Sequence, residues 1–117
     1  MPNPSTWRDD AWLVDILKAA QRIQEYAHGL DRDSFLAHPL RQDAILRQLT
    51  IIGEAAKRLS PEFRSSRSEI PWRDVAGFRD VVVHDYFNVE LEEVWRIVRD
   101  DVPTLLRLVA PLVPPEE

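Results

Sequence analysis

The sequence predicts an all-α protein: an antiparallel, up-and-down four-helix bundle with one extra short helix. Apolar residues recur three and four positions apart along four stretches of the 117-residue chain, which is the spacing of amphipathic helices. No stretch alternates apolar and polar residues between hairpin turns, as a half-buried strand would. Capping residues, prolines and glycines fall near the ends of the four stretches, which supports their assignment as helices.

The first helix is expected to begin near Ser5 or Thr6, whose hydroxyls can cap free backbone N–H groups. Asp9 and Asp10 would then lie in its positively polarised first turn. Gly29 should end the helix, because glycine tolerates the left-handed conformation at helix C-termini. The apolar stripe consists of Leu13, Ile16, Ala20, Ile23 and Ala27.

Residues 30–39 should form a connection with a short turn, and the second helix should cover about residues 40–59. Gly53 costs this helix roughly 1 kcal/mol relative to alanine, which makes sense if another helix packs closely at that point. Ser60 and Pro61 should end the helix. Its apolar stripe consists of Ile45, Leu49, Ile52, Ala56 and Leu59.

A polar link over residues 60–70 leads to a third helical stretch at about residues 71–86. Gly77 should divide that stretch into a short turn of helix and a following helix. Asn88 is a good N-cap for the last helix. Pro103 should kink the last helix, because proline removes a backbone donor and crowds the preceding turn.

The length suits one domain with a hydrophobic core and is too short for two ordinary domains. We therefore expect a single helical domain over residues 1–110 and a frayed tail over residues 111–117. Neither an apolar signal segment nor an apolar run of membrane-spanning length is present, so a soluble, cytoplasmic protein is expected. The chain has no cysteine and three scattered histidines, so we expect no bound metal and no cofactor.

The formal net charge of −5 argues against bulk attraction to nucleic acid. The charge is unevenly distributed, because residues 41–79 contain eight basic and five acidic side chains, a net charge of +3. Thirteen of the fifteen basic residues are arginine, which favours bidentate contacts with phosphate. Surface charges are usually just solvated, so the composition alone does not assign a nucleic-acid site.

Arg79, His84 and Tyr86 form the pattern Arg-x4-His-x-Tyr. Arginine presents fixed N–H donors to a phosphate, histidine can move a proton near neutral pH, and a tyrosine oxygen can be modified. Asp80 lies four residues before His84, so its carboxylate can orient the imidazole. Five residues on a helix correspond to about 140° of rotation and roughly 7.5 Å of rise, so one copy does not clamp a single phosphate between the arginine and the histidine. Two copies of the helix related by a two-fold axis could bring both residue types to one phosphate.

Ordinary structural interpretations exist for these and other residues. A helical histidine beside an aspartate is most often a surface or capping residue, and Tyr86 could simply pack its ring. Glu54 could pair with Arg58 at i+4 or lie at a dimer contact, both of which are favoured over a catalytic role. Trp72 and Trp95 are interpreted as core residues in preference to base-stacking platforms.

Five segments, taken in order, carry a family resemblance. They are Ile-Ile-Gly-Glu-Ala-Ala-Lys-Arg-Leu at 51–59, Ile-Pro-Trp at 70–72, Gly-Phe-Arg-Asp at 77–80, His-Asp-Tyr-Phe at 84–87 and Val-Trp at 94–95. Together they resemble the HepT-like toxins of the HEPN superfamily. The resemblance extends from about Trp7 to Leu108, which makes it far more specific than the short motif alone.

The resemblance implies a helical protein that forms a two-fold homodimer and cleaves RNA, with tRNA as a candidate substrate, without a metal ion. Arg79 and His84 would be catalytic, and Asp80 would be the supporting polar residue that follows the arginine. The chain would be the toxin of a toxin–antitoxin pair, neutralised when a cognate minimal nucleotidyltransferase antitoxin adenylylates Tyr86. The alternative is a non-enzymatic helical dimer that acts as a binding or adaptor subunit for a nucleotidyltransferase, which the negative net charge favours.

Overall fold

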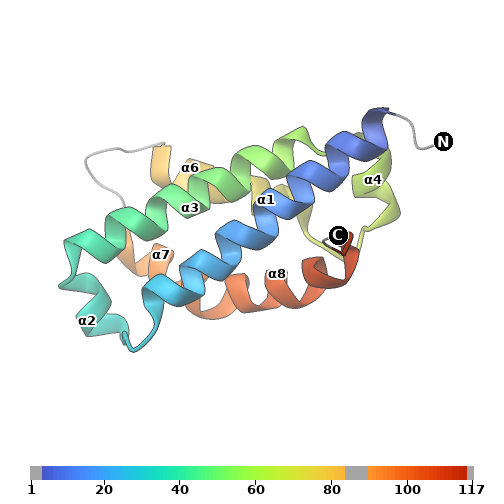
Figure 1. The fold of residues 1–117 in the computed structure, drawn as a ribbon. Coiled ribbons are helices and arrows are strands. Elements are labelled where there is room, and N and C mark those ends of the chain that lie inside the picture. Colours follow the sequence, from blue (N-terminus) through green and yellow to red (C-terminus); the bar gives the residue numbers. More distant parts are fainter. Residues whose placement is uncertain (1–3, 84–89, 116–117) are drawn as a thin grey trace.

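The computed structural model describes the backbone of residues 4–83 and 90–115, and the side chains of residues 8–81 and 90–115. Every regular element in these ranges is a helix, which confirms the predicted all-α class. Two long helices, α1 (Pro4–Ala27) and α3 (Pro39–Arg58), run antiparallel and side by side, and α8 (Val102–Val109) packs against α1 (Figure 1). Figure 1 also shows α6 on the other side of α3 from α8.

The start of α1 differs from the prediction. The helix already begins at Pro4, so the expected cap at Ser5 or Thr6 is wrong, and the two aspartates expected in its first turn lie in the second. Asp9 is only 6% exposed, and its carboxylate accepts hydrogen bonds from Ser60 N at 2.7 Å and Ser60 Oγ at 2.6 Å. This aspartate therefore ties the beginning of α1 to Ser60, two residues after the end of α3, which periodicity along α1 alone could not indicate.

The connection between the two long helices contains the expected short turn. Gly29 adopts a φ of 78° just after α1, in the left-handed region that favours glycine. The turn is a helix, α2 (Arg32–Leu36), that begins with a capping box in which Asp31 and Ser34 exchange hydrogen bonds between side chain and backbone.

Both ends of α3 lie close to the predicted positions. His38 caps its start, because Nδ1 accepts a hydrogen bond from Arg41 N at 3.3 Å. The segment after α3, expected to be a polar link, contains a short helix that the sequence analysis missed, α4 (Pro61–Ser66). Ser60 caps α4 by accepting from Phe63 N at 3.1 Å, so serine followed by proline was the overlooked helix-start signal.

The third helical stretch is divided as predicted at Gly77. The short helix α5 (Trp72–Ala76) precedes this glycine and α6 (Phe78–Val83) follows it. Gly53 of α3 is buried against α6, so the predicted close approach of another helix at this position is confirmed. His84 and Tyr86 lie outside the described residues.

The last helix continues from α7 (Leu91–Arg96) through a π-helical segment, η1 (Ile97–Asp101), into α8, and η2 (Ala110–Leu112) follows. Glu90 occupies the N-cap position of α7, whereas Asn88 was expected there and lies outside the described residues. The π-helical segment ends two residues before Pro103, and the kink predicted at this proline stays a prediction.

The core lies between α1, α3 and the last helix, and short helices close it at the sides. Trp72 is buried and its indole N–H donates to Arg67 O at 3.1 Å, while Trp95 of α7 stacks on Phe35 of α2 at 5.2 Å between ring centroids. Both tryptophans thus belong to packing contacts, as predicted. The largest fully buried side chains are Phe35, Leu13, Ile16, Ile23, Ile45, Leu49, Ile52, Leu59, Ile70, Ile97, Val94 and Val102.

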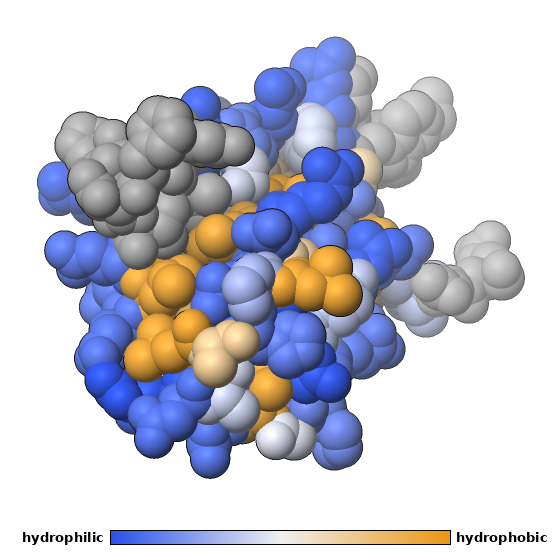
Figure 2. Space-filling model, turned by 90° about the vertical axis from the view of Figure 1, so that its left-hand side faces the viewer, coloured by the Kyte–Doolittle hydropathy of each residue, from blue (hydrophilic) through white to orange (hydrophobic). Residues whose placement is uncertain are grey.

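Hydrophobic residues also reach the surface at one end of the bundle. Figure 2 views the left-hand end of Figure 1, where α2, the start of α3 and α7 lie, and shows hydrophobic residues gathered among hydrophilic ones. Leu40, in the first turn of α3, has 76% of its surface exposed. No helix within the described ranges has both the length and the apolar character needed to cross a membrane.

Candidate functional site

Arg79 lies on α6 where this helix packs against α3, and it forms an ion pair with Glu54 of α3. Arg79 Nε is 2.5 Å from Glu54 Oε1, and the two side chains are 35% and 40% exposed. The expected pairing of Glu54 with Arg58 is therefore wrong. The Arg58 guanidinium instead lies over the ring of Trp12 of α1, 5.3 Å from its centroid.

The ion pair depends on how closely α3 and α6 approach at Gly53. A Cβ atom at this position would lie 2.7 Å from Arg79 Cβ, 2.8 Å from Arg79 N and 2.9 Å from Ala76 O. Such distances are shorter than van der Waals contact, and two of the three atoms belong to backbone that cannot turn away. Only glycine lets the helices meet here, and the next residue along α3 is the glutamate that reaches Arg79.

Asp80 lies on a different side of α6 from the ion pair. It is exposed and lines a groove whose walls are α5, α6 and the α7–η1 stretch. Acidic side chains outnumber basic ones in this groove, so its charge does not favour a phosphate. The charged residues that line it are Arg73, Asp74, Asp80, Glu93, Arg96 and Asp101.

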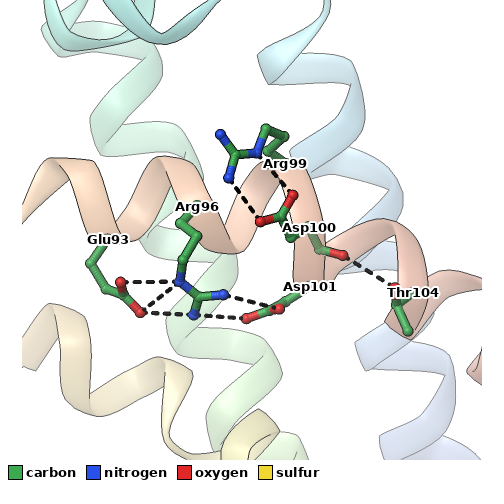
Figure 3. A network of polar contacts seen from close by, with 6 residues as sticks. All are labelled: Glu93, Arg96, Arg99, Asp100, Asp101 and Thr104. Atoms are coloured by element: carbon green, nitrogen blue, oxygen red, sulfur yellow. Dashed lines mark hydrogen bonds and ion pairs between the residues drawn. The ribbon is translucent and has the colours of Figure 1, made fainter.

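Arg96 lines this groove and lies in a polar network with Glu93 and Asp101 (Figure 3). Its guanidinium donates to Glu93, with Nη2 2.8 Å from Oε1, and to Asp101, with Nη2 3.1 Å from Oδ2. These hydrogen bonds raise the pKa of Arg96 above its usual value and hold the pKa of Glu93 below its usual value. The network spans η1, and Thr104 Oγ1 donates a further hydrogen bond to Asp100 O at 3.2 Å.

The structure describes two of the four residues that the sequence analysis singled out. Arg79 contacts α3, whereas Asp80 lines the groove on another side of α6. The proposed contact of Asp80 with His84 stays a prediction, because His84 and Tyr86 lie outside the described residues. Glu54 was assigned the wrong partner. A glycine inside a helix marks a close approach, and that signal points to the residue beside it as a candidate contact.

No group of three histidine, aspartate or glutamate side chains within residues 8–81 and 90–115 is arranged to hold a metal ion.

Comparisons with known proteins identify relatives over most of the chain. Residues 16–112 match the family described as Ribonuclease HepT-like. The chain is 38% identical over 94 residues to "Probable ribonuclease HepT" of Thermococcus cleftensis, covering 80% of this chain and 86% of that protein. It is 34% identical over 106 residues to a "Putative RNase" of Caldanaerobacter subterraneus, covering 91% of this chain and 95% of that protein.

A longer relative occurs in Methanocaldococcus jannaschii. Its name joins gamma-glutamylcyclotransferase and "putative RNase", and it is 39% identical over 94 residues, covering 80% of this chain. The present chain spans only 42% of that protein's length. No solved structure matches the chain.

Proposed function

Because the chain belongs to the HepT-like ribonuclease family, we propose that it is a metal-independent endoribonuclease and the toxin of a toxin–antitoxin pair. The observation that carries the proposal is the match over residues 16–112, which includes the whole Arg-x4-His-x-Tyr pattern. The position of Arg79 supports it, because a partly exposed arginine fixed to a neighbouring helix can present donors to a phosphate.

In the proposed reaction the ribose 2′-oxygen attacks the adjacent phosphorus while the bond from phosphorus to the 5′-oxygen breaks. The 2′-hydroxyl proton must leave and the departing 5′-oxygen must gain a proton, and His84 transfers protons in these steps. Arg79 stabilises the negative charge that develops on the phosphate oxygens. The products are a 2′,3′-cyclic phosphate and a 5′-hydroxyl end.

The proposed active form is a homodimer in which two copies of Arg79 and His84 line one cleft. This arrangement removes the difficulty that one helix directs the two side chains about 140° apart. The exposed Leu40 and the hydrophobic residues visible in Figure 2 supply apolar surface of the kind that a second copy can cover. A monomer at micromolar concentration that still cleaves RNA would contradict this composite site.

The nuclease is tested by expressing the chain alone and by incubating the purified protein with total tRNA and with a labelled single-stranded RNA. We expect growth inhibition and RNA cleavage, both abolished by Arg79→Ala and by His84→Ala with helical content unchanged in circular dichroism. Replacing the ribose at the cut site by 2′-deoxyribose should stop cleavage. Full activity of a folded His84→Ala protein would refute the catalytic assignment, and lack of toxicity in the wild type would favour the adaptor alternative.

We also propose that a minimal nucleotidyltransferase antitoxin silences the enzyme by adenylylating Tyr86. Each adenylate would add an anionic group two residues from His84, where it would compete for the donors of Arg79 and repel an RNA phosphate. Co-expression with the nucleotidyltransferase followed by intact-mass measurement should show adenylate increments that Tyr86→Phe loses. The same increments in Tyr86→Phe would refute this assignment.

A further inference from the structure

We propose that Glu54 is a positioning residue for Arg79. Its carboxylate holds the Nε edge of the guanidinium, so that the terminal amino groups are left to bind the RNA phosphate. This inference rests on the proposed ribonuclease function and adds to it a residue outside the Arg-x4-His-x-Tyr pattern.

The way in which Arg79 is paired is the first argument. Glu54 Oε1 lies 2.5 Å from Nε, the nitrogen nearest the aliphatic stem. The two terminal nitrogens carry four of the five N–H donors of a guanidinium. No other ion pair or side-chain hydrogen bond of Arg79 is formed with the described residues, and its side chain is 35% exposed. A phosphate can therefore reach the paired donors at the free edge without displacing Glu54.

The rigidity of the contact is the second argument. Glu54 lies inside a 20-residue helix, and the adjacent Gly53 brings α3 into direct contact with the backbone of Arg79. Arg58, which could otherwise compete for the carboxylate from one turn away, is held over Trp12. The two backbones are thus held close together, and Arg58 is paired with Trp12 instead of the carboxylate, so Arg79 is the cation that Glu54 contacts. Loss of such positioning matters in catalysis, because a displacement of about 1 Å can cost a hundredfold in rate.

The experiment measures kcat and KM for RNA cleavage in Glu54→Ala and Glu54→Gln, each made in the wild type and in the Arg79→Lys background. Asp43→Asn, which removes a charge from an exposed position on the same helix, is the matched control. Thermal melting, monitored by circular dichroism, reports on folding. If Glu54→Ala does not fold, the isosteric Glu54→Gln replaces it in the comparison. Dissociation constants for a 2′-O-methyl RNA report on variants whose turnover is too slow to measure.

We expect Glu54→Ala to lower kcat by about 10- to 100-fold with the shape of the pH–rate profile unchanged. Glu54→Gln keeps an acceptor oxygen and should lose less, and Asp43→Asn should retain full activity. Lysine has one ammonium group that cannot serve carboxylate and phosphate from separate edges. In the Arg79→Lys background, Glu54→Ala should therefore cause no further loss in cleavage or in binding of the 2′-O-methyl RNA.

Equal losses in both backgrounds would overturn the proposal, because Glu54 would then act independently of Arg79. Unchanged activity of a folded Glu54→Ala protein would also overturn it, as would the loss of one limb of the pH–rate profile, which would make Glu54 a proton-transfer group. These outcomes leave the ribonuclease function intact. A wild-type protein that cleaves none of the RNAs would refute the proposed function itself, together with the inference that rests on it.

Discussion

Two arginines on neighbouring helices, Arg79 and Arg96, show how differently similar ion pairs can be used. Their side chains are comparably exposed, at 35% and 44%. Arg96 uses all three of its nitrogens, because Nε and Nη2 donate to Glu93 while Nη1 and Nη2 donate to Asp101. Arg79 is paired only through Nε among the described residues. Within the described residues the two arginines therefore differ in how many donors are paired and hardly in exposure, which is the difference that the proposed phosphate-binding role of Arg79 requires.

The two pairs also arise from different levels of structure. Both partners of Arg96 lie on its own helix, three residues before and five residues after it, and the π-helical turn η1 brings the i+5 residue alongside. The partner of Arg79 comes from another helix and depends on the glycine that lets the helices touch. The Arg96 network joins residues of one helical segment. The Arg79–Glu54 pair joins two helices, so it can hold the Arg79 side chain in a defined position relative to α3.

The largest expected effect comes from removing Arg79, and removing Arg96 is the matched comparison. Arg79→Ala should lower RNA cleavage by about a thousandfold, because a charge-stabilising donor is lost from the transition state. Arg96→Ala should leave cleavage within about twofold, since exposed ion pairs contribute little and this guanidinium has no free edge for a phosphate. Single-turnover cleavage with matched melting curves makes the measurement. Similar losses in the two variants would show that unused donors do not separate the two roles.

A second test breaks the tertiary contact without touching either charge. Gly53→Ala should destabilise the fold by about 1 to 3 kcal/mol, because the new methyl group meets one backbone atom of α5 and one of α6 that cannot move aside. Gly77→Ala is the comparison, since its Cβ would lie 3.2 Å from Asp74 O, a tight contact but a milder one than those at Gly53, in an ordinary helical conformation. Urea unfolding measures the free energy of unfolding of both variants. RNA cleavage by Gly53→Ala should fall by more than its unfolded fraction explains. Equal effects of the two substitutions would argue against a special role of the α3–α6 contact.

The sequence was sufficient for the helical class, the division at Gly77 and the close approach at Gly53, because each follows from a local preference of glycine or from apolar spacing. It did not reveal that Asp9 accepts hydrogen bonds from Ser60 or that Glu54 forms an ion pair with Arg79. Both contacts join residues far apart in the chain, and helix periodicity does not say which polar side chains meet across a packed interface. The short helix α4 was not predicted for another reason: serine followed by proline marks the end of α3 and also the start of the next helix.

The catalytic assignment was predicted in a different way. Arg79, His84 and Tyr86 were found by their spacing and by the family resemblance, and the family itself is confirmed by the match over residues 16–112. The individual roles stay predictions, since two of the three residues lie outside the described part of the chain. On one helix the arginine and the histidine would project about 140° apart, so the site shared between two copies also stays a proposal.

The smallest expected effect is a dependence of stability on pH that belongs to the Arg96 network. The hydrogen bond from Arg96 holds the pKa of Glu93 below its ordinary value of 4.5, so the folded state binds this proton less readily than the unfolded chain does. The stabilisation from Glu93 should therefore be fully present above pH 4.5 and should be lost as the pH falls through the lowered pKa.

The stabilisation from the Glu93–Arg96 pair should stay below about 1 kcal/mol, because solvent screens a pair whose side chains are 40% and 44% exposed. Urea unfolding of the wild type and of Glu93→Gln at pH 7 and at about pH 3 isolates this contribution, because the other carboxylates titrate alike in both proteins. The difference between the two proteins should shrink at the acidic pH and at high salt. A difference that is the same under all these conditions would mean that Glu93 stabilises the helix by packing, and that the contrast with Arg79 is not one of charge.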